Sequence, residues 1–232
     1  MKKLAIVLLA MLVVPVYAEE SNFAGPSQIH GYWILPTPPA SDSAIAKAEL
    51  AELHRIQSSR TSEEEAQAKA DAADESLSIY KTVLGERFNP AALPLTAALG
   101  NRVKHDEGVN ADPLKQAFKR MRPYNLDKSL KPVCKATAKD NSYPSGHATA
   151  GYLAALTLID MVPEQRDAIL VRADAYAHNR LICGVHYPSD IAAGKLLAYS
   201  AHAVMETNPR YQAELAAAKA ELRRQLGLPV AE

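Results

Sequence analysis

The helical texture of this chain limits its possible folds more than any other feature of the sequence. From about residue 43 onward, segments rich in Ala, Leu, Glu and Lys follow one another, with prolines at their boundaries. Proline suits the first turn of a helix and forces the residue before it out of the helical region, so it marks helix starts and ends. No segment alternates apolar and polar residues over a useful length, and no internal repeat is visible. We therefore expect an all-α fold, built as one helical domain.

Start and stop signals divide this domain into predicted helices. Residues 43–80 predict two antiparallel helices, the second beginning with a capping pattern at Thr61. Asp112 and Pro113 suit the N-cap and first position of a separate helix, which should end near Pro123. The sequence also predicts a loop over 124–143 and helices over 89–108, 147–162, 164–182, 187–207 and 208–227.

Residues 1–18 have the pattern of a secretory leader. Two lysines precede a run of about a dozen apolar residues, and the small residues Val16 and Ala18 stand before a predicted cleavage point. The run is too short for a spanning helix. We predict a signal peptide over 1–18, an extended arm over 19–42 and a helical domain over 43–232; an uncleaved anchor is the alternative.

The balance of charges bears on the partners of the mature chain. Without Lys2 and Lys3 it has 24 basic and 26 acidic residues, a formal charge of about −2. This balance indicates neither nucleic acid nor a membrane surface as a partner. No second stretch approaches the roughly 18 to 20 apolar residues that cross a bilayer, so we expect a soluble, periplasmic protein.

The chain has two cysteines, Cys134 and Cys183. In an oxidising compartment they can form a disulfide that closes a loop of about 50 residues, worth about 3 to 4 kcal/mol in the chain-entropy model. Two buried free thiols are the alternative.

Residues 142–151, SYPSGHATAG, bring Ser145, Gly146 and His147 together just before a predicted helix. A helix start offers unpaired N–H groups and the positive end of the helix dipole, and glycine lets the backbone approach a ligand closely. The segment therefore suits a bound anion. An ordinary serine cap explains the same residues, and both interpretations stay open.

Two further segments carry cations and a histidine. Lys115 and Arg122 are seven residues apart, nearly two helical turns, and this spacing predicts that they share a helix face. A solvated surface face is the alternative for this pair. Arg180, His186 and Asp190 follow, and the Asp190 carboxylate is within plausible reach of the His186 ring, whose protonated nitrogen it could fix.

Together the three segments match the needs of phosphoryl transfer. This chemistry takes cations to hold the oxygens, a nucleophile, and a proton donor for the leaving group. The order Lys-x6-Arg-Pro, Pro-Ser-Gly-His and Arg-x5-His-x3-Asp resembles the signature of the type 2 phosphatidic acid phosphatase (PAP2) superfamily, which also contains the vanadium haloperoxidases. Within it, the chain looks most like the secreted bacterial class A non-specific acid phosphatases. The resemblance implies the helical bundle of that superfamily and runs from about LPTPPASDS to the last helix.

The resemblance also implies a role for each site residue. His186 would attack phosphorus and become a phosphohistidine, Asp190 would orient it, and His147 would protonate the departing alkoxide. Asn179 stands where the family usually has a serine, which implies altered support for Arg180 without loss of activity. The phosphate ligands implied are Lys115, Arg122, Ser145, Gly146 and Arg180.

The function expected is therefore a periplasmic acid phosphatase that hydrolyses small phosphomonoesters, with an acidic pH optimum if His147 is protonated in the complex. Inorganic phosphate or vanadate should inhibit it, and the resemblance suggests a homo-oligomer.

No cofactor is expected. His105 and Asp106 could indicate a metal phosphohydrolase, but the further His and Asp pairs of such a site are not evident, so we expect no metal requirement. The alternatives are a vanadate-dependent haloperoxidase and a non-catalytic oxyanion-binding module. A membrane lipid phosphatase is a further alternative, but the lack of further spanning segments argues against it.

Overall fold

The computed structural model describes residues 20–230, which form helices and no strand. The predicted signal peptide lies outside these residues. The short N-terminal helices and the first long pair are α1 (Pro26–Ile29), α2 (Gly31–Ile34), α3 (Ala44–Ser59) and α4 (Ser62–Ala73). Next come η1 (Leu77–Tyr80), α5 (Lys81–Leu84), η2 (Pro90–Ala92), α6 (Pro94–Phe118) and α7 (Pro123–Leu126). The chain ends with α8 (Gly146–Met161), η3 (Pro163–Gln165), α9 (Arg166–Ile182), α10 (Pro188–Met205) and α11 (Pro209–Leu226). The expectation of an all-α fold is confirmed.

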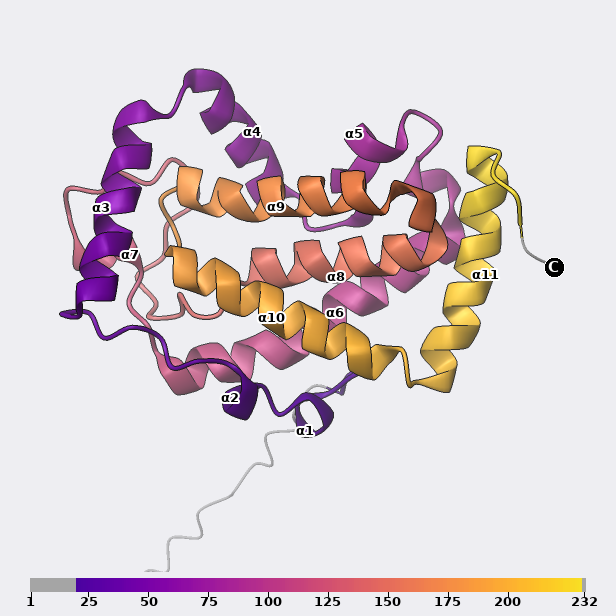
Figure 1. Ribbon diagram of the computed structural model, residues 1–232, viewed down its shortest axis with the longest axis horizontal. Helices are drawn as coiled ribbons and strands as arrows, with labels where there is room; N and C mark the ends of the chain where they lie inside the picture. The colour runs from indigo at the N-terminus through magenta and orange to yellow at the C-terminus, as the bar shows by residue number, and fades with distance from the viewer. Residues whose placement is uncertain (1–19, 231–232) are drawn as a thin grey trace, which may run out of the picture.

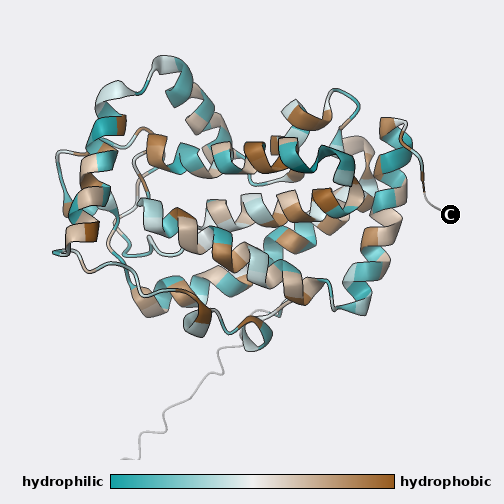
Figure 2. Cartoon of the chain, in the orientation of Figure 1, coloured by the Kyte–Doolittle hydropathy of each residue, from teal (hydrophilic) through white to brown (hydrophobic). Residues whose placement is uncertain are grey.

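Helix α8 forms the centre of the bundle, in contact with α6, α9, α10 and α11 (Figure 1). Eleven of its sixteen residues are buried, and many of them are alanines that let the neighbouring helices approach closely. The hydropathy colouring agrees, since α8 is mostly white to brown whereas α11 shows teal turns along its length (Figure 2). A helix that is apolar on every side belongs in the interior. The position of α8 matters because the SYPSGHATAG segment forms its start.

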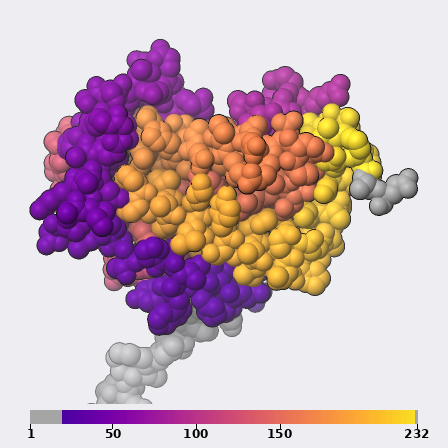
Figure 3. All heavy atoms as spheres, viewed as in Figure 1, coloured from indigo at the N-terminus to yellow at the C-terminus, as the bar shows by residue number. Residues whose placement is uncertain are grey.

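The N-terminal segment of the domain packs against the bundle. Phe23, Ala24 and Leu35 are buried, and the segment is not extended throughout, because it includes the one-turn helices α1 and α2. The buried Asp106 carboxylate on α6 anchors it by accepting hydrogen bonds from the N–H groups of residues 22, 23 and 24 at 2.6, 2.7 and 3.0 Å. Figure 3 shows the indigo N-terminal residues lying against α10.

Helices α3 and α4 are joined at Arg60 and Thr61, and the predicted capping box of Thr61 with Glu64 is present. The two helices run in opposite directions, as expected, but they diverge from this turn (Figure 1). Both contact α9 instead. Their faces toward α9 carry Leu53, Ile56 and Ala68, which are buried. Burying these side chains is more favourable than a contact between two helices rich in alanine and glutamate would be.

The predicted helix start at Asp112 and Pro113 is also wrong. Pro113 lies inside α6, which runs without a break from Pro94 to Phe118 and ends at Lys119 with a left-handed conformation of φ 46°. Proline removes one backbone hydrogen bond from a helix but does not have to end it when tertiary contacts hold both sides. Leu114, next to Pro113, supplies such a contact in the core.

Among residues 20–230, none of the helices combines the length and the apolar character that a bilayer crossing requires.

Candidate active site

A cavity of about 560 Å³ collects side chains from the three predicted motifs. Helix α6 contributes Lys115, the segment after it Arg122, and the end of α9 and the turn beyond it Arg180 and His186. The start of α8 contributes Gly146 and His147. Segments that are far apart in the sequence thus converge on one pocket, which also has Lys104, Lys135, Glu75, Glu107 and Asp112 in its wall.

The ring of His186 is held in one tautomer by a hydrogen-bond acceptor at one ring nitrogen and a donor at the other. Its Nδ1 lies 3.2 Å from the Asp190 carboxylate, which can only accept when ionised, and its Nε2 lies 3.2 Å from Arg122 Nη1, which can only donate. Nδ1 therefore carries the proton, and Nε2 presents its lone pair. Burial, together with the charges of Arg122 and Arg180, lowers the pKa of His186 well below its usual value, so the imidazole is neutral.

Asp190 is buried behind His186 at the start of α10 and accepts from several donors. They are the Ser142 hydroxyl at 2.5 Å, the Tyr187 N–H at 2.9 Å and Arg120 Nη1 at 2.7 Å. Burial raises the pKa of Asp190, whereas these donors and the charge of Arg120 favour the ionised form. Arg120 also pairs with Glu49 of α3 at 2.8 Å, so the support of the histidine reaches from α10 to α3.

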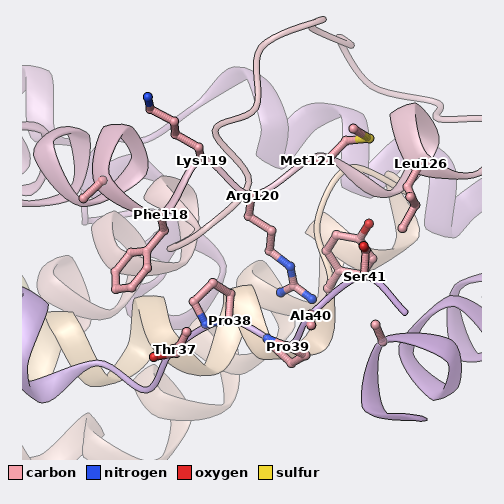
Figure 4. A pocket seen from close by; sticks show the side chains of 13 residues that line it. Thr37, Pro38, Pro39, Ala40, Ser41, Phe118, Lys119, Arg120, Met121 and Leu126 are labelled. Carbon is pink, nitrogen blue, oxygen red and sulfur yellow. The ribbon is translucent and has the colours of Figure 1, made fainter. Parts of the chain in front are cut away.

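Arg120 also lines a second cavity, of about 430 Å³. Figure 4 shows its side chain pointing from the segment after α6 toward Pro39 and Ala40, while Lys119 points away. The walls of this second cavity are mainly apolar. The buried Arg120 side chain thus forms ion pairs with two carboxylates, those of Glu49 and Asp190.

Arg122 reaches the pocket by a different route from the one predicted. Because α6 ends at Phe118, Arg122 is not on a helix face shared with Lys115; it is the N-cap residue of α7. Its guanidinium is fixed by Asn141 Oδ1 at 2.9 Å and by the Val185 carbonyl at 2.9 Å. The two cations meet at the pocket through tertiary structure and not through helical spacing.

Arg180 projects from the last turn of α9 and is 5% exposed. Burial lowers its pKa to about 10, which leaves the guanidinium positive at neutral pH. Its Nε is buried and has no hydrogen-bond partner among residues 20–230. The neighbouring Asn179 does not support it; Asn179 Nδ2 donates to Asp71 on α4 at 2.7 Å instead.

The disulfide between Cys134 and Cys183 is present. It ties the loop before α8 to the residue that caps α9, and Cys183 Sγ lies 3.6 Å from Arg180 Nη1. The bridge therefore connects two walls of the pocket.

His147 has an acidic partner that the sequence did not reveal. Its Nδ1 lies 3.0 Å from Glu75 Oε1, in the segment that follows α4. The hydrogen bond with His147 lowers the pKa of Glu75 to about 2, so this carboxylate is ionised. Lys104 also pairs with Glu75, at 3.1 Å.

Ser145 and Gly146 form the N-terminus of α8, as predicted. The Ser145 hydroxyl is fully buried and accepts from the N–H of Ala148 at 3.3 Å, which is the geometry of a helix cap. Gly146 lines the pocket, and its N–H belongs to the first turn, whose donors have no partner inside the helix. The cap and the anion-binding interpretation are thus compatible.

Residues 92–212 match the PAP2 superfamily. The chain belongs to this family. The PAP2 chain is similar to the "non-specific acid phosphatase" of Salmonella typhimurium, with 28% identity over 96% of this chain and 93% of the relative. This similarity supports the resemblance to bacterial acid phosphatases that was inferred from the motifs.

Two solved structures share the PAP2 fold with this chain. A transmembrane PAP2 type phosphatidylglycerolphosphate phosphatase from Bacillus subtilis has a TM-score of 0.53 and 17% identity, over 72% of this chain and 87% of its own. A bacterial vanadium-dependent iodoperoxidase has a TM-score of 0.57 and 20% identity, over 75% of this chain and 52% of its own. These likenesses concern the fold alone.

Several residues of the site carried no signal in the sequence. Glu75 and Glu107 are single carboxylates among many in helical segments, and Arg120 resembled one more surface cation. Their importance comes from burial and from partners on other helices, which spacing along one segment cannot reveal.

Proposed function

We propose that this chain is an acid phosphatase that hydrolyses small phosphomonoesters in two steps, through a phosphohistidine at His186. The observation that carries the proposal is the buried, neutral His186, whose Nε2 lies 3.2 Å from Arg122 Nη1 at the wall of a pocket that Lys115 and Arg180 also line. The similarity to bacterial non-specific acid phosphatases supports the same activity.

In the first step, His186 Nε2 attacks phosphorus and the bond from phosphorus to the ester oxygen breaks. Arg122, Arg180 and Lys115 neutralise the phosphoryl oxygens, and the Gly146 N–H donates to one of them. His147 gives its proton to the leaving alkoxide. The Asp190 carboxylate stabilises the positive charge that His186 acquires.

In the second step, a water molecule attacks the phosphohistidine, and His147, now neutral, accepts its proton. The bond between Nε2 and phosphorus breaks, and inorganic phosphate leaves. Cationic side chains supply the charge that divalent metals supply in other phosphatases, so we propose that no metal is needed. A chelator should leave activity unchanged; loss of activity that a divalent cation restores would contradict this part of the proposal.

His186→Ala tests the proposal against a non-catalytic binding module. We expect the variant to lose at least about 10³-fold in kcat while inorganic phosphate still binds, because the cations remain. Retained turnover would contradict the proposal. Vanadate should inhibit the wild type competitively, and a vanadate-loaded enzyme that halogenates with peroxide would support the haloperoxidase alternative instead.

We also propose that the protein is secreted to the periplasm after removal of residues 1–18, and that it forms a homo-oligomer. The mass of the mature chain isolated from the periplasm should correspond to a start at Glu19. Sedimentation at equilibrium measures the assembly, and a monomer at all concentrations would contradict it.

A further inference from the structure

Glu107 is a buried carboxyl group in the pocket that the proposed mechanism does not use. It lies on α6, eight residues before Lys115, and is 7% exposed. It belongs to the wall of the cavity of about 560 Å³ that Arg122, Arg180 and His186 line. Its Oε1 is buried and has no hydrogen-bond partner in the part of the chain that the structure describes. An unpaired buried carboxyl oxygen is costly, and this one lies where a substrate would bind.

Glu107 and Lys115 both face the start of α8. A Cβ atom at Gly146 would lie 2.8 Å from Glu107 Oε1 and 3.0 Å from Lys115 Nζ. Both side chains therefore occupy the space beside the Gly146 backbone. The carboxyl group lies next to the backbone N–H that is available to an anion.

The charges around Glu107 come from every wall of the pocket. Lys104, Asp112 and Lys115 are on its own helix, and Glu75 approaches from the segment after α4. The ionisable groups on the other walls are Lys135, His147, Arg122, Arg180 and His186. Burial raises the pKa of Glu107 to about 7, with Lys115 acting in the opposite direction. The group thus changes charge near neutral pH.

We propose that Glu107 is an anion-binding residue of this pocket: its protonated carboxyl donates a hydrogen bond to an oxygen of the bound tetrahedral anion, and its ionised form repels that anion. This inference rests on the proposed function for the identity of the ligand, and it adds a group outside the three motifs. Glu107 would thus make anion binding by the pocket stronger in acidic solution.

The binding of sulfate measures this effect, because sulfate is a tetrahedral dianion that does not itself titrate between pH 6 and 8. If only the protonated form of Glu107 binds, a pKa near 7 makes the dissociation constant about tenfold larger at pH 8 than at pH 6 from this group alone. Glu107→Gln keeps the shape and a donor but cannot ionise. Other groups of the pocket are the same in both proteins, so the comparison isolates the contribution of Glu107.

The experiment is calorimetry of sulfate binding to the full chain at pH 6 and pH 8. We expect the ratio of the two dissociation constants to be about tenfold larger in the wild type than in Glu107→Gln. Asp112→Asn is the matched control, since it removes an exposed carboxylate that pairs with Lys115 at 2.9 Å. Because Glu107 still titrates in this variant, the ratio of its two dissociation constants should stay above that of Glu107→Gln. Equal ratios in the wild type and Glu107→Gln, or no sulfate binding at pH 6, would overturn the inference.

A second measurement needs no variant. Carbon-13 NMR of the wild type, with the Glu107 carboxyl assigned by triple-resonance spectra, follows its titration with and without sulfate. Reciprocal linkage requires sulfate to raise the pKa of Glu107. A pKa that sulfate leaves unchanged or lowers would overturn the inference, whereas a wild type that binds sulfate but hydrolyses no phosphomonoester would overturn only the proposed function.

Discussion

At the scale of single residues, the contact between His147 and Glu75 gives the proposed general acid a fixed orientation. A group that protonates the leaving oxygen matters most when that oxygen is a poor leaving group. We therefore expect His147→Asn to lower kcat by about 10² to 10⁴-fold for alkyl phosphates and much less for a nitrophenyl phosphate. Steady-state kinetics on both substrates measures the difference. An equal loss on both would contradict the role of His147 as general acid.

Glu107 also predicts how stability depends on pH. Its pKa is raised by burial to about 7 in the folded protein, so the folded state keeps a proton that the unfolded chain loses above about 4.5. The stabilisation is complete below the unfolded pKa and is lost as the pH rises to the folded pKa. Between pH 4 and 8 the free energy of unfolding of the wild type should fall by roughly 3 kcal/mol relative to Glu107→Gln. Urea unfolding measures this slope, and parallel curves would contradict it.

At the scale of elements, the crossing of α8 and α10 sets the position of the backbone at the start of α8. A Cβ atom at Gly194 of α10 would lie 2.6 Å from the Ser145 carbonyl oxygen, so the helices approach here without a side chain between them. We expect Gly194→Ala to cost about 1 to 3 kcal/mol of stability and to lower kcat, since the start of α8 must shift. Unfolding curves and kinetics measure both effects.

Gly108→Ala on α6 is the matched control for stability, because an added methyl group there meets nothing within 4 Å. It should leave the protein as stable or slightly more stable through helix propensity. If Gly194→Ala behaved in the same way, the close crossing would not constrain the site.

Most helices were predictable from the sequence, whereas the contacts between them were not. Proline and capping signals correctly marked the starts of α4, α10 and α11. Pro113 misled the same reasoning, because contacts of α6 with the core preserve the helix around it. The three motifs predicted that Lys115, Arg122, Arg180 and His186 meet, and the structure brings them to one pocket, although the helical spacing offered for the first two does not exist. Glu75, Glu107 and Arg120 could not be found in this way, because the residues of α8 and α10 that they lie against, His147, Gly146 and Asp190, are far away in the sequence.

At the scale of the whole molecule, the disulfide joins residues 49 apart in the sequence and ties the loop before α8 to the end of α9. Closing a loop of this length in the unfolded chain is worth about 4 kcal/mol in the chain-entropy model. We expect Cys134→Ser combined with Cys183→Ser to lose stability of that order, and to weaken phosphate binding because Arg180 contacts the bridge. Urea unfolding and phosphate titration measure both. Unchanged phosphate affinity would show that α9 alone holds Arg180.

The central claim is that His186 forms a covalent bond to phosphorus during turnover. Rapid mixing of the enzyme with a phosphate-labelled substrate, followed within milliseconds by an alkaline denaturing quench and peptide mapping, tests it most directly. We predict label on the peptide that contains His186, and none in His186→Ala. Turnover without labelled protein, or label on another residue, would contradict the account.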